Sequence, residues 1–169
     1  NIHAQLSDGL LNDRRAQGRL RYEHVEIRDS CYIPPEQPDI ISKEFSSIMK
    51  KASEIVDPFE QSLFLLVHIP YLQPFEDCNK RTSRLVCNVP LLANGILPVS
   101  WSEVAPRDYA DALLCIYEKN SVYGLTGVFV ESCMRSFERF ELAGKERQPD
   151  RLEITYAKQI ATAVKNRIV

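Results

Sequence analysis

Apolar residues recur at helical spacing along most of the chain. Between residues 38 and 53 they lie three or four positions apart, as on the buried face of an amphipathic helix. The segment 59–67 is apolar on nearly every side, which is typical of a central buried helix, and Asp57-Pro58 is suited to cap its start. We expect Pro70 and Pro74 to end this helix.

The second half of the chain continues the helical pattern. A helix is expected to begin near Asn79 and to stop at Asn94-Gly95, kinked or shortened by Pro90. Another is expected over residues 106–119. The next helix carries an apolar stripe that we expect in the core, at Leu125, Phe129, Cys133, Phe137 and Phe140, and a last helix is expected over about residues 149–167. The first dozen residues are expected to hold a short helix.

One segment alternates apolar and polar residues as a half-buried strand does. Residues 25–28 show this pattern, Asp29-Ser30 can turn the chain, residues 31–33 can return it, and Pro34-Pro35 stops the pairing. The sequence therefore predicts a small β-hairpin over residues 24–33. The expected fold class is mainly α, with this hairpin beside the helices.

Composition narrows the class of protein. The chain has 169 residues, enough for one domain with its own core, and a formal net charge of −2. That charge argues against direct contact with nucleic acid, and the sequence holds no apolar run of about 18 residues that would span a membrane. Residue 1 is Asn rather than Met, so we expect a piece of a longer protein.

The distribution of cysteine and of charge refines this picture. Five cysteines are scattered without a CxxC pair, and three histidines are present, so a structural zinc site is not expected. Unpaired cysteines fit a reducing compartment, and we expect a cytoplasmic protein. Residues 145–169 carry six Lys/Arg against three Asp/Glu. We therefore predict a domain over residues 1–144 and a basic C-terminal helix or linker over residues 145–169.

Chemically active side chains gather in residues 71–84, Tyr-Leu-Gln-Pro-Phe-Glu-Asp-Cys-Asn-Lys-Arg-Thr-Ser-Arg. A buried helix ends there, a loop follows, and a new helix starts. The free N–H groups and the dipole of a helix start favour an anion, and Lys80, Arg81 and Arg84 add positive charge. Asp77 supplies a carboxylate of the kind that holds Mg²⁺ beside phosphate oxygens. The segment indicates a site that handles a nucleotide.

This segment resembles the core motif of the Fic (Fic/Doc) family, His-Pro-Phe-x-(Asp/Glu)-Gly-Asn-Gly-Arg-x-x-Arg. The positions that match in register are Pro74, Phe75, Asp77, Asn79, Arg81 and Arg84. The run Gly18-Arg19-Leu20-Arg21 resembles the family's Gly-x-x-Arg lead-in, and the expected hairpin resembles the flap that docks the target segment. The resemblance covers about residues 18–143.

The resemblance implies ATP and Mg²⁺ as cofactors, and transfer of AMP to a hydroxyl of a protein substrate. The motif His, which is the family's general base, corresponds to Gln73, and Asp77 would hold Mg²⁺. The residues implied at the phosphates are Cys78, Asn79, Lys80, Arg81 and Arg84. The flap residues implied in docking the protein substrate are Glu26, Ile27, Tyr32 and Ile33. A homo-oligomer stays open.

Three departures from the motif leave three functions open. Gln73 cannot take a proton near neutral pH, and loss of a general base typically costs about 10²–10⁴ in rate. Cys78 and Lys80 replace the two glycines that allow close backbone approach to phosphate. The chain is then an AMP transferase with altered or lost catalysis, or a non-catalytic binding and regulatory module. The third function is phosphoryl transfer, because Asn-Lys-Arg resembles the Doc branch.

For several individual residues, two roles are open. His68 is a replacement base or a core residue, and Glu76 is a replacement base or an exposed helix residue. Cys78 is a reactive thiol at a helix start or a small residue in place of glycine. Tyr109 and Tyr117 flank an adenine base or belong to the core.

Overall fold

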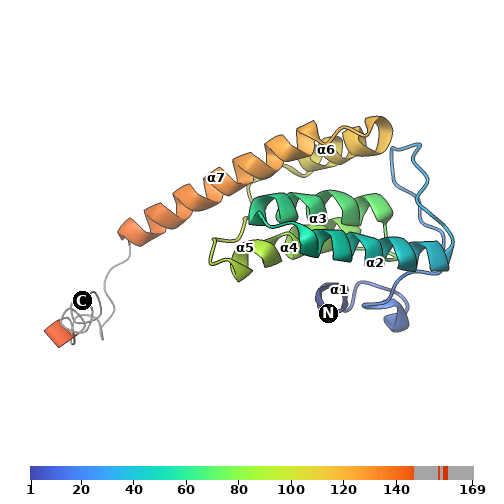
Figure 1. Ribbon diagram of the computed structural model, residues 1–169, viewed down its shortest axis with the longest axis horizontal. Coiled ribbons are helices and arrows are strands. Elements are labelled where there is room, and N and C mark those ends of the chain that lie inside the picture. Colours follow the sequence, from blue (N-terminus) through green and yellow to red (C-terminus); the bar gives the residue numbers. More distant parts are fainter. Residues whose placement is uncertain (147–155, 157, 160–169) are drawn as a thin grey trace. The chain divides into compact units, whose positions relative to one another are not determined.

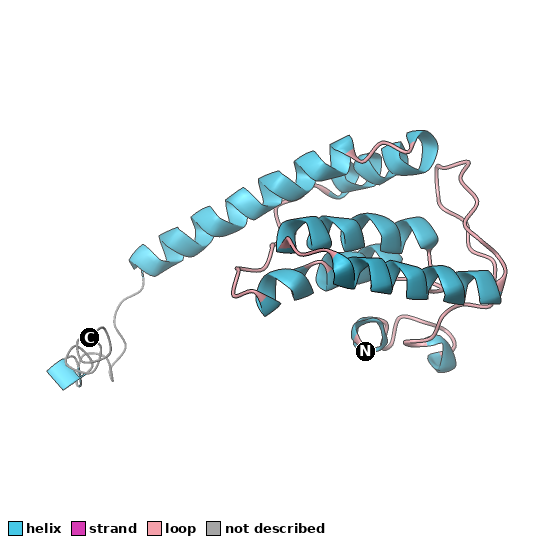
Figure 2. Cartoon of the chain, viewed as in Figure 1, coloured by secondary structure: helices cyan, strands magenta, loops and turns pink. Residues whose placement is uncertain are grey.

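The computed structural model describes residues 1–146 together with residues 156, 158 and 159. In that part of the chain every regular element is a helix (Figures 1 and 2), as the mainly α prediction expects. The chain divides into two compact units, residues 1–136 and residues 137–169, and the first contains the motif. The elements are α1 (Ile2–Leu6), η1 (Arg14–Ala16), α2 (Pro38–Glu54), α3 (Pro58–Leu72), α4 (Asn79–Val86), α5 (Asn88–Ala93), α6 (Pro106–Lys119) and α7 (Tyr123–Glu146).

Helix α3 is the centre of the first unit, because it contacts α2, α4, α5 and α6. Its start is fixed by the carboxylate of Asp57, which accepts hydrogen bonds from the amides of Phe59 and Glu60 at 2.9 Å. Leu65 and Ile69 are buried against Ala52 of α2. The nearly all-apolar segment is therefore the buried helix that its composition predicts.

The expectation that Pro70 ends α3 is wrong, whereas Pro74 directly follows the end of the helix and the helix before Pro90 is shortened as expected. Pro70 lies inside α3, which continues to Leu72 and ends at Gln73, a residue in the left-handed conformation. A proline this near the C-terminus removes one hydrogen bond, and the rest of the helix tolerates it. Between α4 and α5 the break falls at Cys87, three residues before Pro90. The ring of a proline clashes with the carbonyl four residues earlier, which explains a break on that side.

The predicted β-hairpin over residues 24–33 is not formed. Within this segment the backbone makes one hydrogen bond with itself, from the Ser30 amide to the Ile27 carbonyl at 3.2 Å. The tip is held from outside instead, because the carboxylate of Glu118 accepts from the Cys31 amide at 2.8 Å and from the Ser30 hydroxyl. The segment is therefore a loop anchored on α6, and we call residues 24–33 the flap.

Helix α7 is buried along one face in its first half, at Leu125, Phe129 and Cys133. The expectation that the stripe continues into the core as far as Phe140 is wrong, because 60% of that residue is exposed. Most of the predicted helix over residues 149–167 lies outside the described residues, so the division at residue 144 stays a prediction. Among the described helices, none is long and apolar enough to cross a bilayer.

Candidate functional site

The loop that joins α3 to α4, residues 73–78, carries the motif and lies between two left-handed residues. Gln73 has a φ of 50° and Cys78 a φ of 60°. The second is where the family motif has its first glycine, and the positive φ gives the physical reason for glycine there. A side chain in this conformation costs about 1–2 kcal/mol. The loop thus has a strained cysteine at the position where the motif has a glycine.

The side chain of Gln73 is buried in a hydrogen-bonded network. Its Nε2 donates to the Pro70 carbonyl at 2.7 Å, and its Oε1 accepts from Nδ2 of Asn79 at 2.8 Å. The amide of Asn79 also bridges the loop, since its Oδ1 accepts from the Phe75 amide and its Nδ2 donates to the Phe75 carbonyl. The Gln73–Asn79 pair therefore fixes the loop against the first turn of α4.

Arg21, the last residue of the lead-in, is buried and joins three segments. Its Nε donates to the Gln73 carbonyl at 2.6 Å, and its other nitrogens donate to the carbonyls of Glu23 and Pro35. Its amide donates to the Pro74 carbonyl at 2.9 Å. The residues that flank the flap on either side and the motif loop are thus held by one guanidinium, whose pKa is lowered by burial.

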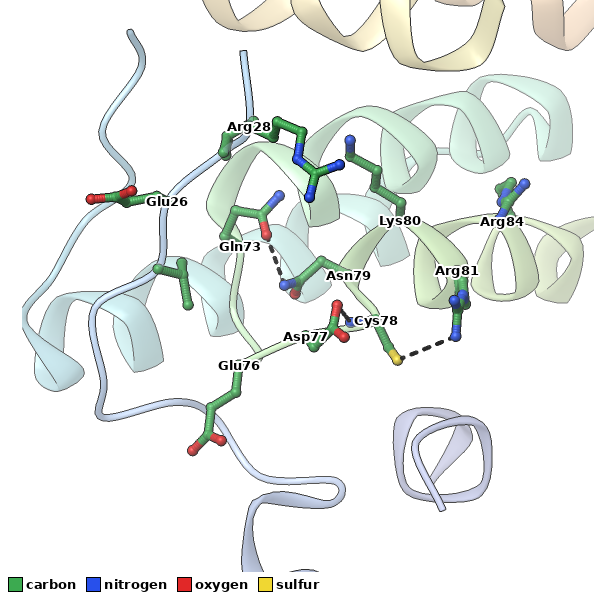
Figure 3. Close-up of a pocket in the computed structure, with 12 residues that line it drawn as sticks. Glu26, Arg28, Gln73, Glu76, Asp77, Cys78, Asn79, Lys80, Arg81 and Arg84 are labelled. Atoms are coloured by element: carbon green, nitrogen blue, oxygen red, sulfur yellow. Dashed lines mark hydrogen bonds between the residues drawn. The ribbon is translucent and has the colours of Figure 1, made fainter. Parts of the chain in front are cut away.

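A cavity of about 360 Å³ lies between the flap, the motif loop and the first turn of α4 (Figure 3). Its lining residues are Val25, Glu26, Ile27, Arg28, Gln73, Glu76, Asp77, Cys78, Asn79, Lys80, Arg81 and Arg84. The structure therefore brings together the motif residues and the first arm of the flap. Tyr32 and Ile33, from the second arm, do not line it. Tyr32 stacks on Tyr71 with ring centroids 4.5 Å apart, and Ile33 is exposed.

The start of α4 is open to this cavity. No side chain caps the helix, so its first-turn amides lack the partner that Asp57 gives to α3. Arg81 extends from this turn toward the sulfur of Cys78, with 4.0 Å from Nη1 to Sγ, and Arg84 lies one turn on, 5.1 Å from the ring centre of Tyr109. An uncapped helix start beside cations suits an anion with several oxygens.

The family follows from comparison with known proteins. A family model described as "Fic/DOC family" matches residues 1–91, which contain the lead-in, the flap, the motif loop and α4. The chain belongs to the Fic/DOC family. A "Protein adenylyltransferase Fic" of Nematostella vectensis is 31% identical over 97 residues, which cover 55% of this chain and 22% of that protein. The chain thus spans about a fifth of the length of that relative.

In this Fic domain the two tyrosines considered for an adenine site are core residues. Tyr109 and Tyr117 are both buried, and neither lines the cavity. The Tyr117 hydroxyl donates to the Pro70 carbonyl at 3.1 Å, and the Tyr109 hydroxyl is 3.3 Å from the hydroxyl of Ser83. Burial raises the pKa of Tyr109 to about 12. These side chains support α3 and α4 from behind the site.

The structure supports neither Cys78 as a reactive thiolate nor His68 as a replacement base. Burial, and then the nearby Asp77 carboxylate, raises the pKa of the Cys78 thiol, so a helix start does not make it a reactive thiolate here. His68 lies on α3 outside the cavity, stacked on Phe64 with ring centroids 4.0 Å apart. Its Nδ1 is 3.0 Å from the Phe64 carbonyl, and burial lowers its pKa.

His3 is a buried residue of this Fic domain that the sequence did not point to. Its Nδ1 accepts from the Gly18 amide at 2.9 Å, so the proton is on Nε2, which donates to the Asp77 carbonyl at 3.2 Å. The ring also stacks on Phe75 with centroids 3.9 Å apart. The motif loop is thus held by α1 as well as by the lead-in. No local sequence signal marks contacts 15 and 74 residues away.

The donor set around the motif loop fits a magnesium–nucleotide. The Asp77 side chain is exposed to the cavity, and its Oδ1 accepts from the Cys78 amide, which leaves Oδ2 open. Among the described residues there is no group of three or more metal-ligating side chains. Mg²⁺ does not require one, because it is commonly held by one or two carboxylates together with phosphate oxygens and water.

Proposed function

We propose that this Fic domain binds ATP with Mg²⁺ in the cavity and that its AMP transfer to a protein hydroxyl is suppressed. The adenylyltransferase name of its relative supports ATP as the nucleotide. The observation that carries the proposal is Gln73, which occupies the position of the general base and has its side-chain amide engaged on both sides.

Gln73 accounts for the loss of proton transfer. An amide has no basic site near neutral pH, and its oxygen already accepts the hydrogen bond of Asn79. Neither of the two alternative bases considered, His68 and Glu76, is placed to replace it. His68 lies outside the cavity, and the carboxylate of Glu76 extends away from Gln73 (Figure 3). The missing base lowers the rate of AMP transfer by about 10²–10⁴.

The residues that would bind Mg²⁺ and the phosphates are present. Asp77 would hold Mg²⁺, and the uncapped start of α4, with Arg81 and Arg84, would hold phosphate oxygens. When bound, Mg²⁺ neutralises charge on the phosphate oxygens. Lys80, which stands in place of a glycine, adds a point charge where the motif has close backbone contact.

The flap is the proposed docking site for a protein segment. The peptide groups of residues 24–26 make no hydrogen bond within the described part of the chain, so they can pair with an extended strand. Glu26 and Ile33 are exposed beside them, while Ile27 and Tyr32 pack inward and hold the flap in place. The domain would then present a protein segment beside the bound nucleotide.

Incubation with ATP labelled at the α or the γ phosphate, with Mg²⁺ and a cell extract, tests this proposal. We expect ATP binding by equilibrium dialysis with little transfer of either label. Rapid transfer of the α label would contradict the suppressed catalysis. Transfer of the γ label alone would favour the Doc-like phosphoryl reaction, because the Asn-Lys-Arg run that includes Lys80 resembles the Doc branch.

Two variants locate the activity in the cavity. Gln73→His restores an imidazole at the base position and is expected to raise AMP transfer by about 10²–10⁴. Asp77→Ala is expected to remove the Mg²⁺ dependence of ATP binding. Dependence on Mg²⁺ that survives in Asp77→Ala would show that the metal is held elsewhere.

A further inference from the structure

Resting on the proposed function, we infer that Arg28 of the flap and Lys80 of α4 clamp the polyphosphate chain of a nucleoside di- or triphosphate from opposite sides of the cavity. Arg28 is outside the family motif, and Lys80 replaces one of its glycines. The domain would therefore recognise phosphate charge partly through two charged side chains, whereas the motif's glycines let the backbone approach the phosphates closely.

The backbone places Arg28 at the corner of a tight turn. The Ser30 amide donates to the Ile27 carbonyl at 3.2 Å, so Arg28 and Asp29 are the central residues of a four-residue turn. Asp29 has a φ of 64°, the left-handed conformation that a type II turn requires at this position. Arg28 is exposed at this corner, and its side chain lines the cavity (Figure 3).

The turn is fixed on both sides of Arg28. Ile27, the residue before it, is 7% exposed and packs inward. After the turn, the Glu118 carboxylate accepts from the Cys31 amide and the Ser30 hydroxyl. Those hydrogen bonds lower the pKa of Glu118, which keeps it ionised. A positively charged side chain is thus presented on a braced turn, which reduces the entropy lost when it binds an anion.

Arg28 and Lys80 have no partner of opposite charge in the described part of the chain. Figure 3 shows their side chains extending toward one another, and both line the same cavity. The carboxylates of Glu26 and Glu76 extend away from them. Glu26 is instead near His24, with 3.7 Å from Oε1 to Nε2. Two unpaired cations that converge from separate elements repel each other until an anion lies between them.

The surroundings favour phosphate over a simple carboxylate. The uncapped amides of α4, Arg81 and the exposed Asp77 share the cavity, so it offers several donors and one metal-binding oxygen. A chain of phosphates with Mg²⁺ can engage all of these groups, whereas one carboxylate reaches few of them. The clamp therefore predicts preference for ATP and ADP over AMP.

The test measures affinities for Mg·ATP and for AMP in the full chain by titration calorimetry. The variants are Arg28→Gln, Lys80→Gln and the double variant, with Arg19→Gln as the matched control. Arg19 is an exposed arginine of the lead-in that does not line the cavity. Thermal unfolding of each variant checks that the fold is kept.

We expect Arg28→Gln and Lys80→Gln each to weaken ATP binding about tenfold, and AMP binding much less. The double variant should lose less than the product of the two single effects, because both side chains contact the same phosphates. Arg19→Gln should bind as the wild type does. ATP binding by Arg28→Gln equal to that of Arg19→Gln would overturn the clamp while leaving the proposed function intact. A wild-type chain that does not bind Mg·ATP would overturn the proposed function itself.

Discussion

Replacement of Arg21 by methionine is expected to be among the most destabilising single changes in the chain. Methionine keeps an unbranched apolar stem of similar length and removes the guanidinium. Three hydrogen bonds are lost, to the carbonyls of Gln73, Glu23 and Pro35. The change therefore releases the motif loop and the residues that flank the flap on either side together.

The size of the effect follows from those contacts. Hydrogen bonds to a charged group contribute about 1.5–3 kcal/mol each, and part of this is offset because the buried cation no longer loses its hydration. We expect a loss of about 3–5 kcal/mol in the free energy of unfolding, a large part of the 5–15 kcal/mol typical of a domain. Arg21→Lys should lose about half as much, since one ammonium cannot reach three carbonyls on separate segments.

Urea unfolding followed by circular dichroism measures the difference, with Arg19→Met as the exposed control two residues earlier. The midpoint should fall by about 1–3 M for Arg21→Met at an unchanged slope. An unfolding free energy within about 1 kcal/mol of the Arg19→Met value would refute the assignment of Arg21 as the group that joins lead-in, flap and motif loop.

Three smaller effects are expected in the same assay. Thr82→Val should raise the free energy of unfolding by about 1 kcal/mol, because the buried Thr82 hydroxyl has no hydrogen-bond partner among the described residues; a decrease would mean that the hydroxyl is satisfied. The free energy of unfolding of Cys78→Gly should be about 1 kcal/mol higher than that of Cys78→Ala, since glycine has no strain at a φ of 60°. The reverse order would contradict the left-handed conformation of this residue. Burial lowers the pKa of His68 in the fold, so stability should be full above the unfolded pKa near 6.5 and fall as the pH falls below it. His68→Leu should reduce the dependence of stability on pH and leave only the part due to His3, whose pKa is also lowered by burial. An unchanged pH dependence would mean that His68 does not contribute to it.

Much of the helical fold can be read from the sequence, because helices depend on contiguous residues. The apolar segment 59–67 and the Asp57 cap identify α3 without reference to the rest of the chain. The flap could not be predicted in the same way. The alternation over residues 25–28 is real, but the tip of the segment is hydrogen-bonded to Glu118, and Arg21 holds Glu23 and Pro35 on either side of it. The partners that decide its conformation are therefore not in the segment.

For the site, too, contiguous residues could be predicted from the sequence, and residues that the fold brings together could not. Its motif residues are contiguous, so the sequence alone led to the predictions of an anion site at the start of α4 and of a missing base at Gln73, and both stay predictions. Arg28 was missed because the alternating pattern was interpreted as a paired strand, in which no residue stands at a turn's corner. The local signal was Asp29-Ser30, which marked a turn, but the structure centres this turn one residue earlier, on Arg28 and Asp29. His3 became visible only once the fold placed α1 against the motif loop.

The most direct measurement of the central claim compares ATP binding with transfer of the α-phosphate label in the same samples of wild-type chain and Gln73→His. We expect both to bind Mg·ATP, and the wild type to transfer the α label at least a hundredfold more slowly than Gln73→His. A wild-type chain that transfers the α label at a rate that Gln73→His does not increase would contradict this expectation.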